Sequence, residues 1–227
     1  MIGEAQKCQI IIDSSPQSGK RNMEIDGSLL EQVCENSSLA FVRIYHWNEP
    51  TITLGHFQKF SEVPAGPLAK TPCVKRLTGG GAILHDREIT YSIALPAGHL
   101  FRHTPIAAYE SVHTVIIELL QYLGVECGMR ADSPLTTSQP TMATKEDEFL
   151  CFLRSDPRDI VSKGQKIVGS AQRRRKGCIL QHGSILLAES QLTPMIPGLL
   201  NLWPDFDTNV FASQLAHCIS SAICTPR

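Results

Sequence analysis

The sequence predicts an α/β (α+β) fold in which helices flank a central sheet that is mixed and largely antiparallel. One helical stretch is followed by several alternating, β-branched segments joined by short turns. This order differs from the regular strand–helix alternation of a parallel sheet. A later helical stretch has an apolar face broad enough to need a sheet beneath it. At 227 residues the chain can bury a substantial core, so we expect a single domain over residues 1–227.

The first half of the chain contains one predicted helix and a series of short strands. The helix is expected over residues 22–33, where Asn22 is a candidate N-cap and apolar residues recur at helical spacing, although Gly27 weakens the pattern. Alternating or β-branched runs bounded by turn residues predict strands. These lie at 8–12, 40–47, 51–54, 73–77, 82–84 and 89–95.

The clearest helix opens the second half of the chain. Thr104 is its candidate N-cap, and Pro105 occupies the first helical position, where a missing N–H costs nothing. Apolar residues line one face as far as Leu123, and Gly124 ends the helix.

The rest of the chain begins with a change of composition. Residues 131–147 are rich in Asp, Ser, Pro, Thr and Gln, which predicts a mobile loop, either a lid or an insertion without a role. Strand-like sequence resumes at 148–153. Glycine-containing turns then separate three predicted strands, and two helices end the chain. The strands are 159–161, 166–173 and 178–187, and the helices are 193–202 and 209–223.

Composition and charge exclude several classes of function. The net charge of −1 gives no general attraction to nucleic acid or to an anionic membrane. No apolar run approaches the ~20 residues of a membrane span, and the N-terminus lacks a signal-peptide core, so a cytoplasmic protein is expected. The eight cysteines show no C-x-x-C pairing. They are expected to be reduced thiols, and no metal site is predicted.

A glycine-rich stretch, Lys75-Arg76-Leu77-Thr78-Gly79-Gly80-Gly81, is the first candidate site. Three consecutive glycines give up backbone entropy, and close approach of the backbone to a ligand is one reason to retain them. Their N–H groups can face a carbonyl or phosphate oxygen, and Arg76 adds charge. A glycine hairpin between two strands explains the triplet equally well.

A second stretch, Lys166-Ile167-Val168-Gly169-Ser170-Ala171, favours a ligand site over a simple glycine hairpin. Gln181-His182-Gly183 follows it. Upstream, residues 47–58 place Trp, Pro, Thr, Gly and Gln in a Trp-x-x-Pro-x-x-Thr-x-Gly-x-x-Gln pattern. Together with the glycines, these motifs resemble the biotin/lipoate protein ligase superfamily. Its lipoate branch carries a basic pair before the glycines and a Lys-Ile/Val-x-Gly-Ser-Ala signature. The motifs occur in the family's order over roughly residues 20–190.

The resemblance implies a catalytic role for Lys166. The matching lysine of the family contacts the acyl carbonyl oxygen, where a partly buried ammonium stabilises developing negative charge. The small residues Gly169, Ser170 and Ala171 would let the backbone pass close to the ligand. Without the resemblance, a lone lysine in a strand is usually a solvated edge residue.

Cys151 decides which reaction is expected. Leu150 and Phe152 beside it favour a buried, inert thiol. However, the chain here resembles the octanoyltransferases that use a cysteine nucleophile, which carry a Cys-Phe pair shortly before the lysine motif. A thiolate exchanges readily with a thioester, and a nearby lysine cation would favour the thiolate. The sequence after Phe152 matches that subfamily only loosely.

The remaining candidate residues would bind substrate. Arg76 with Gly79, Gly80 and Gly81 would cradle the carbonyl end and the pantetheine or phosphate part of the donor. His85 could be a general base or could cap a turn, a structural or wall role is favoured for His182, and Gly183 beside it is a candidate substrate-binding residue. The basic run 173–176 is either solvated or a docking patch for an acidic partner. A slot for the acyl chain is expected beside Ile83, Leu84 and Tyr91.

The resemblance therefore predicts an acyltransferase of protein lipoylation. It would move an octanoyl or lipoyl group from acyl carrier protein to a lysine of a lipoyl-domain protein through a Cys151 thioester, without a cofactor. One alternative is a lipoate-protein ligase, which would need ATP and Mg. A second is an amidotransferase between lipoyl-domain proteins, and a third is a non-catalytic acyl- or carrier-binding protein.

Overall fold

The computed structural model describes residues 7–132 and 149–224. Its main element is a seven-stranded sheet in the order β1-β2-β6-β10-β9-β8-β7. Its strands are β1 (Lys7–Ile12), β2 (Leu39–Tyr45), β6 (Glu88–Leu95), β10 (Cys178–Leu186), β9 (Gln165–Arg175), β8 (Ile160–Ser162) and β7 (Gly128–Met129). Only β1 and β2 run parallel; the other neighbouring pairs are antiparallel. The predicted mixed, largely antiparallel sheet is confirmed.

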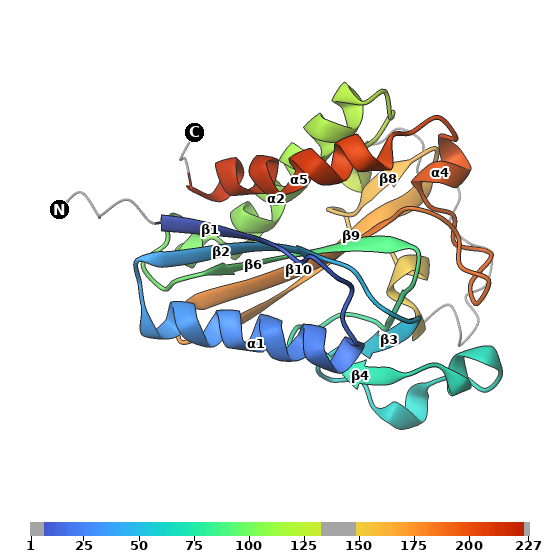
Figure 1. Cartoon of the computed structure of the whole chain (residues 1–227), viewed down its shortest axis with the longest axis horizontal. Coiled ribbons are helices and arrows are strands. Elements are labelled where there is room, and N and C mark those ends of the chain that lie inside the picture. Colours follow the sequence, from blue (N-terminus) through green and yellow to red (C-terminus); the bar gives the residue numbers. More distant parts are fainter. Residues whose placement is uncertain (1–6, 133–148, 225–227) are drawn as a thin grey trace.

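Helices cover both faces of this sheet (Figure 1). The long helices α2 (Pro105–Tyr122) and α5 (Thr208–Cys224) lie on one face, and α1 (Gly19–Glu35) lies on the other. Apolar side chains at helical spacing fill the layer between α2, α5 and the sheet, including Val112, Ile116, Phe211, Leu215 and Ile219. A smaller core under α1 packs Leu29, Leu30 and Val33 against Phe41 and Leu180.

A second, three-stranded sheet lies beside the N-terminal end of α1 (Figure 1). Its order is β4-β3-β5, with β3 (Thr51–Leu54) in the centre, β4 (Cys73–Lys75) parallel to it and β5 (Ile83–His85) antiparallel. The glycines therefore do not form a simple hairpin. They cross from one edge strand to the other over the central strand. Sequence alone predicted these strands but not their separation from the main sheet.

Several connections contain a short helical turn. These turns are η1 (Phe60–Glu62), η2 (Pro67–Lys70), η3 (Leu100–His103), η4 (Arg130–Asp132) and η5 (Cys151–Leu153). Most of the predicted loop 131–147 lies outside the described residues. No helix within residues 7–132 and 149–224 is long and apolar enough to cross a membrane.

The start of one long helix differs from the prediction, and the start of the other agrees with it. Helix α1 begins one turn earlier than expected, because the hydroxyl of Ser18, not Asn22, accepts the capping hydrogen bond from the Arg21 N–H (3.3 Å). Asn22 is fully buried and accepts a hydrogen bond from Arg43 Nη2 (2.7 Å). Helix α2 begins as predicted, with Thr104 as N-cap and Pro105 in the first helical position, although the backbone carbonyl of Thr104 and not its side chain accepts the bonds.

Two further elements were predicted wrongly. Residues 148–153 were expected to be a strand, but Leu150 makes only an isolated bridge to Ala82 before the chain turns into η5. Leu150 and Phe152 are both buried, as their apolar side chains suggest. Within the described residues, however, no strand pairs with this segment beyond the single bridge. The helix expected over 193–202 is reduced to α4 (Leu199–Leu202), since Pro197 supplies no N–H and restricts the residue before it.

Candidate active site

A cleft of about 360 Å³ lies along the outer side of β9 and contains both predicted catalytic residues. Cys151 and Lys166 line it at one end, together with the glycine loop, defined as Gly79–Gly81. Ser170, Ala171 and Gln172 continue its wall along β9, and Tyr109 of α2 closes one side. Residues from four distant parts of the sequence therefore meet in one place.

Cys151 is held against the residue that follows the glycine loop. Its N–H donates a 2.7 Å hydrogen bond to the Ala82 carbonyl, and the Ala82 N–H donates a 2.9 Å bond to the Phe149 carbonyl. A Cβ on Gly81 would lie 3.2 Å from the Cys151 nitrogen and from the Phe149 oxygen. The absence of a side chain at Gly81 thus lets the segment that carries the thiol lie directly on the loop.

Lys166 reaches this thiol from the beginning of β9. Its amino group lies 3.7 Å from Cys151 Sγ and donates a 3.1 Å hydrogen bond to the Cys151 carbonyl. The side chain is almost completely buried. The register between β8 and β9 shifts at this point, since Val161 pairs with Lys166 but Ile160 pairs with Val168. Such a bulge re-aims a side chain.

Gly169 supplies the space that the Lys166 side chain occupies. A Cβ at this position would lie 2.6 Å from Lys166 Cε and 3.1 Å from its Nζ. The glycine of the lysine motif therefore lies under the lysine. Gly169 therefore packs against the Lys166 side chain, whereas Ser170 and Ala171 line the cleft.

Asp159 is the charged partner of Lys166. Its Oδ1 lies 2.9 Å from Lys166 Nζ, and its Oδ2 accepts a 2.8 Å bond from the Asp156 N–H. Burial raises the pKa of Asp159, and the charge of Lys166 opposes that rise. A carboxylate fixed in this way holds the ammonium beside the thiol, where the ammonium can stabilise a thiolate or an oxyanion.

Arg76 is buried behind the glycine loop, with only 2% of its surface exposed. Its Nη2 donates to the carbonyls of Gly79 and Gly81, both at 2.7 Å, and its Nη1 donates to the Thr53 carbonyl at 2.9 Å. Burial lowers the pKa of Arg76 to about 10, against an opposing effect of Cys151. These contacts shape the loop, so the guanidinium has no free side to offer a donor phosphate.

The glycine loop also needs its central residue to be glycine. Gly80 has φ +91°, a conformation that residues with a side chain rarely adopt. The Gly80 carbonyl fills the space where a Cβ on Gly55 would stand. Two glycines far apart in the sequence thus allow the loop to cross the small sheet closely.

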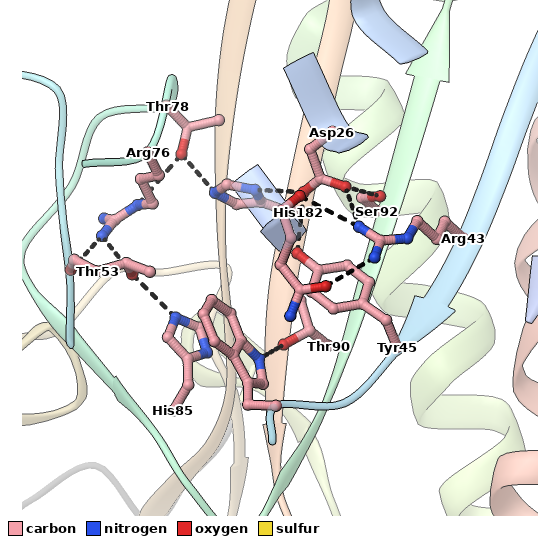
Figure 2. A network of polar contacts seen from close by, with 12 residues as sticks. Asp26, Arg43, Tyr45, Thr53, Arg76, Thr78, His85, Thr90, Ser92 and His182 are labelled. Carbon is pink, nitrogen blue, oxygen red and sulfur yellow. Dashed lines mark hydrogen bonds and ion pairs between the residues drawn. The ribbon is translucent and has the colours of Figure 1, made fainter. Parts of the chain in front are cut away.

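Figure 2 shows a buried polar network behind the loop, centred on Asp26 and His182. His182 Nε2 lies 2.6 Å from Thr78 Oγ1, and its Nδ1 lies 3.3 Å from Asp26 Oδ2. Asp26 also accepts a 2.9 Å bond from Arg43. Burial would raise the pKa of Asp26, but His182 and Arg43 hold it below its ordinary value. His182 thereby connects the buried charges to the residues that support the loop.

His85 lies at the other end of this network (Figure 2). Its Nε2 is 2.9 Å from Thr53 Oγ1, its Nδ1 is 3.3 Å from Glu88, and its ring stacks on Trp47 at 3.9 Å. Burial lowers the pKa of His85, although Glu88 opposes the shift. His85, His182 and Gly183 line an inner cavity and do not line the cleft. The role of His85 as a base stays a prediction.

The residues expected to form an acyl slot do not line one cavity. Ile83 and Leu84 share a space of about 20 Å³, and Ile83 also lines the inner cavity of about 10 Å³. Tyr91 instead hydrogen-bonds Ser170 at 2.6 Å. A cavity that holds benzene measures about 150 Å³, so an eight-carbon chain would have to widen either space.

Sequence reasoning missed three polar residues around the cleft. Asp159 was read only as the start of a strand, and the apolar Ile160-Val161 directly after it was the available sign that its carboxylate is buried. Tyr109 was assigned to the apolar face of its helix. His113, also in α2, is completely buried and contacts Ser170 Oγ at 2.6 Å. No local pattern marked His113.

Comparison with known proteins assigns the chain to a family. Residues 18–209 match the lipoyl protein ligase A/B catalytic domain, a span that includes every cleft residue named above. The chain belongs to this family. The resemblance that the motifs predicted is thereby confirmed.

Relatives of the family that are most similar in sequence include octanoyltransferases. The chain is 37% identical to octanoyltransferase LipM of Anoxybacillus flavithermus over 180 residues, which cover 78% of this chain and 64% of the relative. It is 34% identical to octanoyltransferase LipM of Staphylococcus aureus, over 73% of this chain and 60% of the relative. The chain thus spans less than two thirds of the length of these relatives.

Solved structures of the family share the fold. Lipoate-protein ligase A bound with ATP has a TM-score of 0.71 at 16% identity, over 96% of this chain and 85% of that chain. A bipartite lipoate protein ligase from Thermoplasma acidophilum, described with its E2 lipoyl domain, has a TM-score of 0.68 at 16% identity, over 96% and 84%. At this identity the likeness concerns the fold alone.

Proposed function

We propose that the chain transfers an octanoyl or lipoyl group from acyl carrier protein to a specific lysine of a lipoyl-domain protein. The acyl group would pass through a thioester on Cys151. The observation that carries the proposal is the 3.7 Å contact between Lys166 Nζ and Cys151 Sγ in the cleft. The printed names of the octanoyltransferase relatives support the reaction class. The E2 lipoyl domain described with an archaeal relative supports the class of acceptor.

In the first step the Cys151 thiolate attacks the carbonyl carbon of the donor thioester. The new C–S bond forms first and gives a tetrahedral oxyanion; the donor C–S bond then breaks, and the pantetheine sulfur takes up the proton that Cys151 gave up. The ammonium of Lys166 stabilises the oxyanion between these events, because it is already fixed beside the sulfur and Asp159 prevents it from turning away. No cofactor enters this step.

In the second step the neutral amine of the acceptor lysine attacks the Cys151 thioester. A C–N bond forms, the C–S bond breaks, and the departing Cys151 sulfur takes up the proton that the amine loses. The acceptor would reach the thioester through the cleft, whose lining includes Ser170, Ala171 and Gln172. Exclusion of water by the acceptor domain would favour transfer over hydrolysis.

The test is intact-protein mass after incubation with octanoyl-acyl carrier protein without ATP. The wild type should gain one octanoyl group that hydroxylamine removes, and Cys151→Ala should gain none. Cys218→Ala, which changes another half-buried cysteine, on α5 and not in the cleft lining, is the matched control and should behave as the wild type. The acylated enzyme should then modify a lipoyl domain. Failure to form the adduct, with modification of the domain from free lipoate and Mg-ATP, would replace the proposal with a ligase.

A further inference from the structure

The outer edge of β9 is paired with another strand only along its first half. β8 pairs with β9 only from Gln165 to Val168, and beyond Val168 the described segments place no strand there. The Tyr109 hydroxyl bonds both backbone groups of Ser170, donating to its carbonyl (3.0 Å) and accepting from its N–H (3.2 Å). These backbone groups therefore point outward, along the wall of the cleft.

The alternation of an antiparallel ladder fixes the direction of the next residues. Groups two residues apart on one strand point the same way. The N–H and C=O groups of Gln172 and Arg174 therefore also point away from β10, on the side of Ser170. Because Tyr109 already bonds both backbone groups of Ser170, the edge from Gln172 to Arg174 is the part that presents donors and acceptors to an extended ligand with amides of its own.

A phosphopantetheine arm has the length to follow this edge. The reacting sulfur lies near Gly169, because Lys166 Nζ is 3.7 Å from Cys151 Sγ and 3.1 Å from the place where a Cβ on Gly169 would stand. From Gly169 to Arg174 the strand rises by about 17 Å. The arm has about thirteen bonds between its sulfur and its phosphorus, which span roughly 15 Å at the rise of an extended chain. The phosphate would therefore reach the end of β9.

Positive charge is concentrated where the phosphate would arrive. The turn between β9 and β10 carries Arg173, Arg174, Arg175 and Lys176. Arg173 donates to the Leu77 carbonyl (3.1 Å), and Arg175 pairs with Glu31 of α1 (3.3 Å) on the opposite face. Arg174 is exposed and, by the alternation of the strand, shares the side of Ser170 and Gln172. A guanidinium there can bind a phosphate with two hydrogen bonds.

We propose that the edge of β9 from Gln172 to Arg174 binds the phosphopantetheine arm of the acyl donor and that Arg174 binds its phosphate. This inference rests on the proposed function and adds the site of donor recognition to it. It also agrees with the position of Arg76, whose buried guanidinium is committed to the glycine loop.

Two donors that differ only in the phosphate test the proposal. Octanoyl-phosphopantetheine and octanoyl-pantetheine are each offered to the wild type, and kcat/KM for acylation of Cys151 is measured by mass. The wild type should prefer the phosphorylated donor. In Arg174→Ala the ratio of the two kcat/KM values should fall about tenfold, since one charge-assisted contact is lost. Arg175→Ala, the neighbouring change on the other face, should leave the ratio near the wild-type value.

The outcomes separate this inference from the proposed function. An equal ratio in the wild type and Arg174→Ala would overturn the phosphate site while leaving the Cys151 chemistry intact. If neither donor nor octanoyl-acyl carrier protein acylates Cys151, the proposed function itself fails. If Arg174→Ala slows only the transfer from Cys151 to a lipoyl domain, the turn docks the acceptor and the donor assignment is wrong.

Discussion

Asp159 and Lys166 form a buried ion pair at 2.9 Å, and the same lysine amino group lies 3.7 Å from the Cys151 sulfur. Both charged side chains are nearly inaccessible to solvent. A buried charge needs its partner, because removal of one member leaves the other desolvated and unpaired. The position of the ammonium beside the thiol therefore depends on this carboxylate, and in the proposed reaction Asp159 would be a positioning residue.

Asp159→Asn should slow acylation of Cys151 by at least about tenfold, because the ammonium loses the charge that fixes its direction. Asp159→Glu keeps the charge and should recover part of the rate. Single-turnover mass measurements on folded protein give the rate, and its pH profile should change in Asp159→Asn only. Asp156→Asn changes an adjacent, more exposed carboxylate that pairs with Arg158, and should have a small effect. A wild-type rate in Asp159→Asn would remove the positioning role.

Gly169→Ala should impair catalysis more than stability. The new methyl group would stand 2.6 Å from Lys166 Cε, and the flexible end of the lysine would have to move away from Cys151. We expect a rate loss of about ten- to a hundredfold, with an unfolding free energy lowered by ~1–2 kcal/mol. Gly98→Ala, where a Cβ meets nothing within 4 Å, is the matched control for activity and for urea unfolding. Equal activity of the two variants would contradict the close packing of Lys166.

The sequence motifs predicted the residues of the candidate site more completely than they predicted the contacts that support it. Cys151, Lys166 and the glycine loop were predicted from their residue types and order, and the structure brings them together in one cleft. The contact between Arg76 and the loop carbonyls could not be predicted. A basic residue before glycines is equally compatible with a ligand contact, and only the crossing of the small sheet turns the guanidinium inward.

Long-range pairing explains the other errors. Residues 148–153 have strand-like composition, but whether they form a strand depends on a neighbour about seventy residues earlier, Ala82, which offers a single bridge. Asn22 has the composition of an N-cap, but Arg43 on β2 recruits its side chain. In both cases the local sequence is compatible with two structures, and contacts with distant residues determine which one forms.

Arg76→Lys should destabilise the protein by ~2–4 kcal/mol, even though the charge is kept. A lysine has one nitrogen, which cannot reach the Gly79, Gly81 and Thr53 carbonyls together, so buried acceptors lose their partners. Urea unfolding measures the loss. Arg21→Lys, at an exposed pair with Glu24, should change stability by less than ~0.5 kcal/mol. A stability near the wild-type value in Arg76→Lys would show that the loop does not need the guanidinium.

His113 should make the protein less stable in mild acid. Burial lowers its pKa to about 4, with the Arg158 carbonyl opposing this shift and the Lys166 charge adding to it. The unfolded histidine, with a pKa of about 6.5, binds a proton that the folded one rejects. The stability supplied by a depressed pKa is therefore complete above pH ~6.5 and is lost as the pH falls toward ~4. The loss is at most about 3 kcal/mol.

The comparison with His113→Gln isolates this effect from the carboxylates. Asp26, whose pKa is held below its ordinary value, loses its contribution at a lower pH than this window. The variant gives up the bonds of the ring to Ser170 and to the Arg158 carbonyl, so it should be less stable at pH 7. The difference in unfolding free energy between wild type and variant should shrink between pH 6.5 and 4.5, because only the wild type loses the buried neutral imidazole. Urea midpoints at four pH values measure the difference, and a constant gap would mean that His113 titrates alike in both states.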